Sequence, residues 1–167
     1  MPNHFTTTAI CSNGYSFDVC EFLAEHAQTN LCNAVLPMPD AMKGIAVGYR
    51  REDDCSQWDE KTGEGHTEAK MQELTEEYGA ANSLDWARKF WGLKWGTYDL
   101  AAMKTQGDGS PVIITFCSPW NAPSCLSEIA GWLSSQGQFE KVQFVLFNPY
   151  DDSTSMGPLF EFPDVED

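Results

Sequence analysis

Positive charge is scarce in this 167-residue sequence. It holds 10 Lys and Arg residues against 25 Asp and Glu residues, which gives a formal net charge of −15 and a pI near 4.3. The basic residues are scattered, and no run of them makes a local patch. A field of this sign repels free nucleic acid and attracts basic protein surfaces. The sequence therefore disfavours direct nucleic-acid binding and predicts a protein partner with a basic surface that normally holds nucleic acid.

Long apolar runs and targeting signals are also missing. No stretch of about 18 apolar residues is present, so no membrane-spanning helix is predicted. The opening residues, MPNHFTTTAIC, lack the charged and apolar regions of a secretory signal. The six cysteines form no CxxC pair. We therefore expect reduced thiols and a cytoplasmic location, with no role at a membrane.

Familiar catalytic and metal-binding motifs are absent as well. The sequence has no glycine-rich phosphate loop, no G-x-S-x-G and no H-E-x-x-H. A zinc site that combines Cys55 and His66 matches no known finger spacing. The runs EDD at 52–54 and YDD at 150–152 lack the regular oxygen spacing of a calcium loop. We predict no metal, no cofactor and no catalytic residue, although an unfamiliar chemistry stays open.

What the sequence does contain is hydrophobic periodicity. Alternating or β-branched runs predict strands at residues 5–11, 31–36, 95–100, 112–117 and 141–147, with an edge strand near 158–162. Helical spacing and capping residues predict helices that begin at Ser16, Thr67, Asn82 and Asn121. This order predicts an α+β fold of the ferredoxin-like type. In that split βαβ sandwich, a single antiparallel sheet is covered on one face by two helices.

The charge pattern divides the predicted domain into three parts. The chain length fits a single domain spanning 1–167. Residues from about 38 to 82 are polar, acidic and only partly periodic, and they read as a partly helical insertion. Residues from about 148 to 167 form an acidic C-terminal tail, with six acidic and no basic residues.

The segment WGLKWGTYDL, at 91–100, leaves two roles open. In the first, Trp91 and Trp95 wedge a helix against the sheet, and Lys94 covers a ring or reaches solvent. In the second, the two indoles and Lys94 form a binding platform of aromatic faces and one cation. The first role is the commoner use of such residues. Exposure of either indole beside Lys94 favours the second.

Several segments resemble the YubB-type ferredoxin-like domain family of plasmid and phage proteins. The resemblance rests on MPNH, LPMP, WGLKWGTYDL and ITFCSPWNAPSCLSEIAGWL, and it covers most of the chain outside about 40–80. The positions that match the family motif, for which a mainly structural role is expected, are Trp91, Gly92, Lys94, Trp95 and Asp99. Leu93 and Gly96 depart from it, because the family has polar residues there. The resemblance implies the fold and a mobile-element origin in a bacterial host, and it implies no particular activity.

The acidic charge and the implied origin together predict an interaction protein. We expect an anti-defence inhibitor, of anti-CRISPR or anti-restriction type, whose acidic surface mimics nucleic acid and occupies a basic channel. The predicted contact residues are Glu52, Asp53, Asp54, Glu73, Glu76, Glu77, Asp151 and Asp152, with an exposed Trp58 or Tyr150 as apolar anchor. Two alternatives stay open. One is a small-ligand or metal-binding domain, or an enzyme, with a pocket beneath the insertion. The other is a structural or assembly role in a phage or plasmid.

Overall fold

Five strands form one antiparallel sheet in this computed structural model, which describes residues 4–12, 17–105 and 111–162. The strands lie in the order β4-β5-β1-β6-β7, and every neighbouring pair is antiparallel. Their bounds are β1 (His4–Ser12), β4 (Tyr98–Lys104), β5 (Val112–Pro119), β6 (Lys141–Asn148) and β7 (Ser153–Glu161). The predicted α+β class and single antiparallel main sheet are confirmed.

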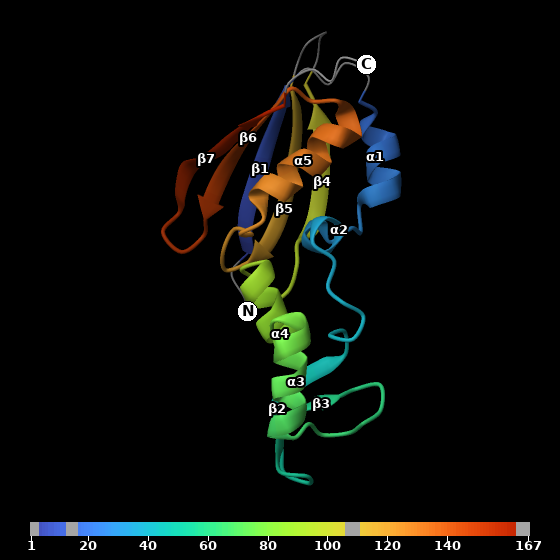
Figure 1. Ribbon diagram of the computed structural model, residues 1–167. Coiled ribbons are helices and arrows are strands. Elements are labelled where there is room, and N and C mark those ends of the chain that lie inside the picture. The colour runs from blue at the N-terminus through green and yellow to red at the C-terminus, as the bar shows by residue number, and fades with distance from the viewer. Residues whose placement is uncertain (1–3, 13–16, 106–110, 163–167) are drawn as a thin grey trace.

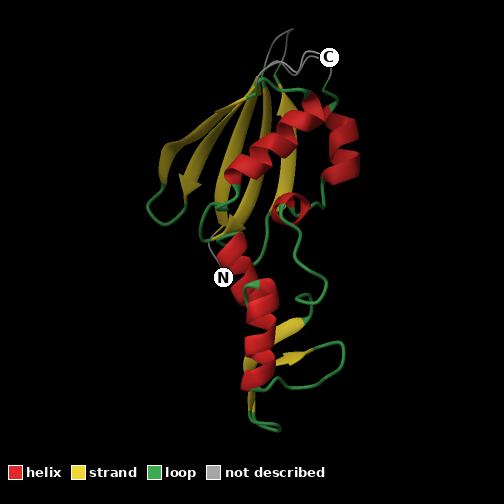
Figure 2. Ribbon diagram, in the orientation of Figure 1, coloured by secondary structure: helices red, strands yellow, loops and turns green. Residues whose placement is uncertain are grey.

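Helices cover only one face of this sheet (Figures 1 and 2). Helices α1 (Val19–His26) and α5 (Leu126–Gly137) lie over the strands, and the short helix α2 (Leu31–Val35) contacts α5. Alternate strand residues point toward the helices and are buried, because successive side chains of a strand face opposite ways. The buried side chains at the centre of this layer are those of Ala9, Ile114, Phe116, Ile129, Leu133, Val142 and Phe144.

Residues 38–97, which we call the extension, project beyond one end of the sheet (Figure 1). They form the antiparallel hairpin of β2 (Ile45–Arg50) and β3 (Cys55–Asp59), and the helices α3 (Glu68–Tyr78) and α4 (Ser83–Phe90). Asn82, the predicted cap, accepts from the amide of Asp85, and Thr67, where the sequence predicts that a helix begins, accepts from the amide of Lys70. Apolar residues of the extension belong to the same buried cluster as the sheet.

The predicted strand at 31–36 is wrong, because this segment is helix α2. The Asn30 side chain accepts a hydrogen bond from the amide of Asn33 and so caps the helix. The Leu31 amide donates to the Thr97 hydroxyl at 2.8 Å. These two bonds, one local and one from Thr97, satisfy the first amides of a helix, and they outweigh the apolar character that favours a strand.

The predicted helix starts at Ser16 and Asn121 also need correction. Ser16 lies outside the described residues, and the cap of α1 is Asp18, which accepts from the amide of Glu21. Helix α5 begins at Leu126, because the Asn121 amide donates to the Pro119 carbonyl and the Asn121 carbonyl accepts from the Ser118 hydroxyl. Those bonds close a turn, so Asn121 lies in that turn and the N-cap position of α5 falls to Cys125.

Three further segments have a secondary structure that differs from, or adds to, the one that the sequence predicts. The strand expected at Trp95 begins at Tyr98, so Trp95 lies in a loop. The insertion contains the β2–β3 hairpin, which its polar composition conceals. The C-terminal segment predicted as an acidic tail includes the edge strand β7, and residues 163–167, like Met1–Asn3 of the MPNH motif, lie outside the described residues. No helix among the described residues has the length and apolar character to cross a membrane.

Candidate functional site

The two tryptophans of WGLKWGTYDL have opposite environments. Trp91 is 4% exposed, its indole N–H donates to the Leu36 carbonyl at 2.9 Å, and its ring meets that of Trp86 edge-on. Trp95 is 44% exposed. The wedge role therefore fits Trp91 alone. The exposure of Trp95 beside Lys94 is the condition that favours the binding platform.

Trp95 pairs with a residue outside its own segment. Its ring meets that of Trp120 edge-on, with the centroids 5.7 Å apart. The Lys94 ammonium lies 4.3 Å from the centroid of the Trp120 ring, on the scale of a cation–π contact. Gly92, with φ of 72°, ends α4 and brings this loop against Ser124. The remaining motif residue, Asp99, is exposed at the irregularity of β4 and makes no contact with this group that the structure records.

The predicted contact residues Glu52, Asp53 and Asp54 lie in the turn of the β2–β3 hairpin. Asp53 forms an ion pair with Arg50 and accepts from the Cys55 thiol at 2.9 Å. The hydrogen bond from Arg50, followed by that from Cys55, lowers the pKa of Asp53 to about 2. Asp54 accepts from the Tyr49 hydroxyl. Two of the three carboxylates are therefore already bonded within the hairpin.

The expectation of an exposed Trp58 is wrong. Trp58 is half-buried, and the Arg50 guanidinium lies 5.0 Å from the centroid of its ring. The other predicted anchor, Tyr150, is exposed in the turn between β6 and β7. Asp151 and Asp152 occupy the same turn, where Asp151 accepts from the Ser153 amide at 3.1 Å.

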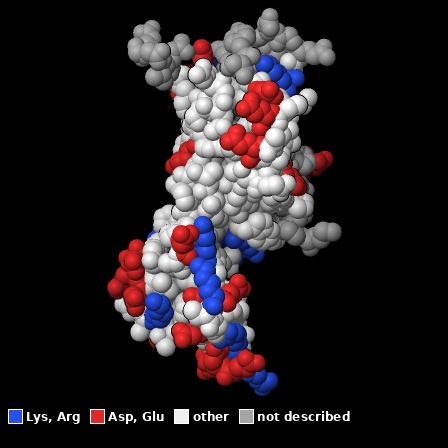
Figure 3. Space-filling model, turned by 90° about the vertical axis from the view of Figure 1, so that its right-hand side faces the viewer, with Lys and Arg blue, Asp and Glu red and all other residues white. Residues whose placement is uncertain are grey.

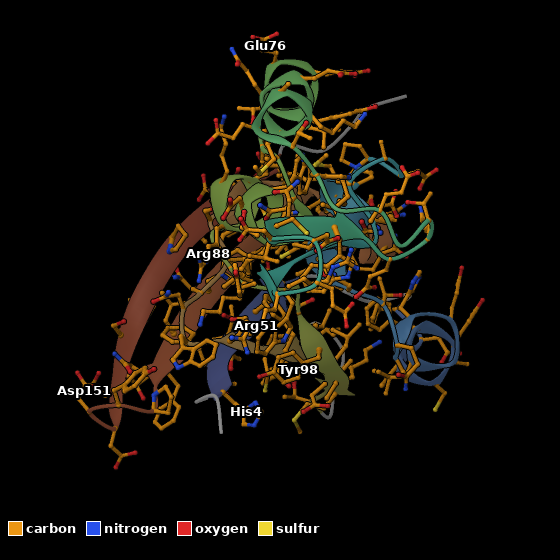
Figure 4. All side chains as sticks on the ribbon, turned by 90° about the horizontal axis from the view of Figure 1, so that it is seen from below. His4, Arg51, Glu76, Arg88, Tyr98 and Asp151 are labelled. Carbon is orange, nitrogen blue, oxygen red and sulfur yellow. The ribbon has the colours of Figure 1, made fainter. Side chains whose placement is uncertain are left out.

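The predicted acidic residues do not come together in one surface. Glu73, Glu76 and Glu77 lie on α3, where Glu73 pairs with Lys70 and Glu76 accepts from Gln72. Figure 1 places the hairpin tip at the far end of the extension and the β6–β7 turn at an edge of the sheet. Figure 4 shows Glu76 and Asp151 at widely separated points of the molecule. A single nucleic-acid-like surface made of all these residues does not form.

The two parts of the chain differ in charge balance. Residues 38–97 hold eight of the ten basic residues together with twelve acidic ones, and the remaining residues hold thirteen acidic residues and two basic ones. Figure 3 shows the mixture of basic and acidic side chains over the extension. The strongest excess of negative charge is therefore in the part of the sequence that forms the sheet, not in the extension.

The thiols and histidines form no metal centre among the described residues, where no group of three or more His, Cys, Asp or Glu is placed to hold an ion. Cys55 donates to Asp53, and a ring nitrogen of His66 is hydrogen-bonded to the Gln57 amide at 2.7 Å. Burial raises the pKa of the Cys11 thiol to about 12. The thiols of Cys32 and Cys125 are buried 3.7 Å apart.

The uncovered face of the sheet, which we call the open face, is a surface on which the sequence reasoning placed none of its partner contacts. The register places Thr6, Thr8 and Ile10 of β1 there, opposite uncharged residues of β5 and β6. The other members are Ala101, Met103, Ile113, Thr115, Cys117, Gln143, Val145, Phe147, Thr154, Met156 and Leu159. Met103, Met156 and Leu159 are exposed, with Met156 at 71%.

Polar pairs mark the two ends of the open face. At one end the His4 ring is hydrogen-bonded to the Tyr98 hydroxyl, and Figure 4 shows these two side chains next to each other. At the other end Lys141 pairs with Glu161 at 3.8 Å. Between these ends the paired residues of the described strands that point to this face include no Asp, Glu, Lys or Arg. Burial raises the pKa of the Cys117 thiol near the His4 end, and Asp99, at the irregularity of β4, adds to this rise. The sequence already indicated an uncharged second face. In strand runs such as VIITFC, neither the odd-numbered nor the even-numbered positions carry charge, so both faces of the strand are uncharged.

Comparisons with known proteins add no relative: no family model, no curated protein and no solved structure matches the chain. The resemblance to the YubB-type family stays a prediction.

The Arg50–Asp53 pair gives a testable pH dependence. Because the pKa of Asp53 is lowered from 3.8 to about 2 in the folded chain, the ion pair persists above the ordinary value and is lost as the pH falls through about 2. We expect an NMR titration of the Asp53 carboxyl carbon to give a pKa near 2. Arg50→Gln should return it toward 3.8. Lys43→Gln, which removes the separate Lys43–Asp40 pair, should leave it unchanged, and a wild-type value near 3.8 would contradict the ion pair.

Proposed function

We propose that the protein is an interaction protein of a phage or plasmid that inhibits a defence machine of its bacterial host, of the CRISPR or restriction type, by binding a basic protein surface. The partner lies against the open face of the sheet. The observation that supports this is the combination on one uncovered face of exposed apolar side chains and paired strand positions that carry no charge between the two ends.

The composition of the open face suits the centre of a protein interface. The centre of such interfaces is apolar and poor in charged residues, while the rim is polar. Met103 and Met156 are exposed from strands at different positions across the sheet, and methionine adapts its shape to a partner. The strands between them present the half-buried Ile10, Ile113 and Val145. Large apolar areas on a protein surface mark interaction sites.

Acidic residues at the edges of the sheet indicate that the surface of the partner is basic. Asp99 lies at the start of β4, and Asp151 and Asp152 lie in the β6–β7 turn toward the opposite edge, beside the exposed Tyr150. With thirteen acidic residues against two basic ones outside the extension, the field speeds association with a basic, nucleic-acid-binding surface. The contact residues Asp151, Asp152 and Tyr150 stay in this proposal. Those of the hairpin tip and α3 are peripheral to it.

The ferredoxin-like fold is part of the same proposal. In the strand order β4-β5-β1-β6, α1 lies in the connection from β1 to β4, and α5 lies in that from β5 to β6. This arrangement supports a split βαβ sandwich with β7 as an added edge strand. The YubB-type motif residues Trp91, Gly92, Lys94 and Trp95 support the assignment of a mobile-element origin.

The function is tested by protection of a phage. The protein is expressed in bacteria that carry a CRISPR or a restriction system, and the plaquing efficiency of a targeted phage is measured. We expect protection by the wild type and a loss of about tenfold or more with the double variant Met103→Lys, Met156→Lys, because two buried unpaired charges weaken an interface strongly.

The matched control places the same charges on the extension. Val47→Lys, Tyr49→Lys changes two exposed residues of β2, and Tyr49 is 71% exposed, as is Met156. This control should protect as well as the wild type. Equal protection by the open-face variant would place the binding surface elsewhere, and no protection by the wild type in either system would overturn the proposed function.

A further inference from the structure

An open hollow of about 310 Å³ lies between the end of α4 and the segment that follows β5. It is lined by Arg88, Gly92, Leu93 and Lys94 on one side and by residues 119–121 on the other. Its volume is at the lower end of the range that holds small-molecule ligands. It lies apart from the extension's hairpin and its acidic turn, and none of the contacts proposed for the partner uses it.

Two backbone features build this hollow. The amide of Ser124 donates to the Trp91 carbonyl at 2.9 Å, which ties the segment after β5 to the end of α4. Trp120 has a φ of 61°, a left-handed conformation that a bulky residue rarely adopts. The Ser118 hydroxyl donates to the Asn121 carbonyl and so closes the turn around Trp120. Strain of this kind persists where surrounding structure enforces it, and it is concentrated at functional sites.

Trp120 is the aromatic residue of the lining, and Trp95 contacts it from outside the lining. Trp95 is 44% exposed and contacts Trp120 edge-on, while Trp91, four residues earlier, fills the core. Indole faces bind planar rings by stacking, and the stacking tolerates different bases because every base has a π face.

The positive charge at the hollow is also free for a ligand. Of the described residues, Arg88 and Lys94 form no ion pair with any carboxylate, whereas Lys43, Arg50, Lys70 and Lys141 each form one. Arg88 extends from the last turn of α4 (Figure 4), and the ammonium of Lys94 lies over the Trp120 ring. Two unpaired cations beside one hollow, in a chain of net charge −15, point to a small anion.

We propose that this hollow binds a nucleoside phosphate, with the base against the indoles of Trp95 and Trp120 and the phosphate between Arg88 and Lys94. A ligand with both a base and a phosphate contacts the aromatic rings and the two cations at once, whereas a base or a phosphate alone contacts only one of these groups. A long nucleic-acid strand fits less well, because its many phosphates would meet the acidic remainder of the protein. This site does not depend on the proposed anti-defence function, and either can fail without the other.

The test is a titration of the full chain with adenosine monophosphate, followed by the NMR signals of the indole N–H groups. We expect saturable shifts of the Trp95 and Trp120 signals, while the Trp91 signal, bonded to Leu36, stays in place. Adenosine and inorganic phosphate, each tested alone, should bind about tenfold more weakly than the nucleotide. Arg88→Gln and Lys94→Gln should each weaken nucleotide binding about fivefold or more, since each removes a charge-assisted contact.

The controls separate this site from general charge attraction. Lys43→Gln removes an exposed cation of the extension and should leave the affinity unchanged. Trp95→Ala, at an exposed position, should fold normally and bind about tenfold more weakly. Absent shifts, equal binding of inorganic phosphate, equal weakening by Lys43→Gln, or tighter binding of a single-stranded oligonucleotide than of the nucleotide would each overturn the proposal.

Discussion

Replacing Trp91 by alanine should lower the free energy of unfolding by about 3–5 kcal/mol. The indole is 4% exposed, and it belongs to the buried cluster that joins the extension to the sheet. Its removal leaves a cavity against Trp86 and deprives the Leu36 carbonyl of its hydrogen bond. Urea denaturation followed by circular dichroism measures the change.

Trp95→Ala is the matched control, because it makes the same substitution four residues later. Trp95 is 44% exposed and its ring contacts that of Trp120, so we expect a loss below about 1 kcal/mol. Comparable losses for the two variants would contradict the opposite environments of the two indoles. They would also remove the reason to assign a binding role to Trp95.

Gly96→Ala should lower the free energy of unfolding by about 2–4 kcal/mol, from overpacking and a lost helix cap together. A Cβ at this position would lie 1.9–2.1 Å from the side-chain atoms of Asn30. That amide cannot move away freely, because its oxygen accepts from the amides of Asn33 and Thr97. The substitution therefore disturbs the start of α2 and the approach to β4 at once. Thermal and urea unfolding measure the loss.

Gly131→Ala provides the comparison for Gly96. Gly131 lies inside α5, and apart from its chain neighbours and the adjoining helix backbone no heavy atom of the described residues lies within 4 Å of the position that a Cβ would take. Since alanine favours a helix over glycine by up to about 1 kcal/mol, this variant should be as stable as the wild type or more so. A Gly96→Ala protein as stable as the wild type would show that Asn30 does not hold this junction.

The strands that the sequence predicts best are those whose own residue composition, rich in apolar, β-branched and aromatic side chains, favours a strand. Val112–Pro119 and Lys141–Asn148 are rich in apolar, β-branched and aromatic residues, and both form strands. Thr67 and Asn82 cap helices by contacts within three residues, which a sequence pattern captures. Segment 31–35 fails because its helix depends in part on Thr97, which is 66 residues away.

The candidate sites were harder to predict, since they depend on which face or neighbour the fold supplies. Trp95 and Trp120 belong to separate segments, and the contact of Ser124 with Trp91 and Gly92 brings them together. The exposure of Met103 and Met156 depends on helices lying over one face of the sheet only. Periodicity shows alternation, but it does not show which of two uncharged faces is left uncovered.

The proposed role of the open face is tested most directly by quantitative affinity capture of a purified CRISPR effector or restriction enzyme. The wild type, the open-face variant Met103→Lys, Met156→Lys and the extension variant Val47→Lys, Tyr49→Lys are compared at low and high salt. We predict capture by the wild type and the extension variant, weakening as salt rises because the partner is basic, and loss of capture by the open-face variant. Undiminished capture by the open-face variant would contradict the account.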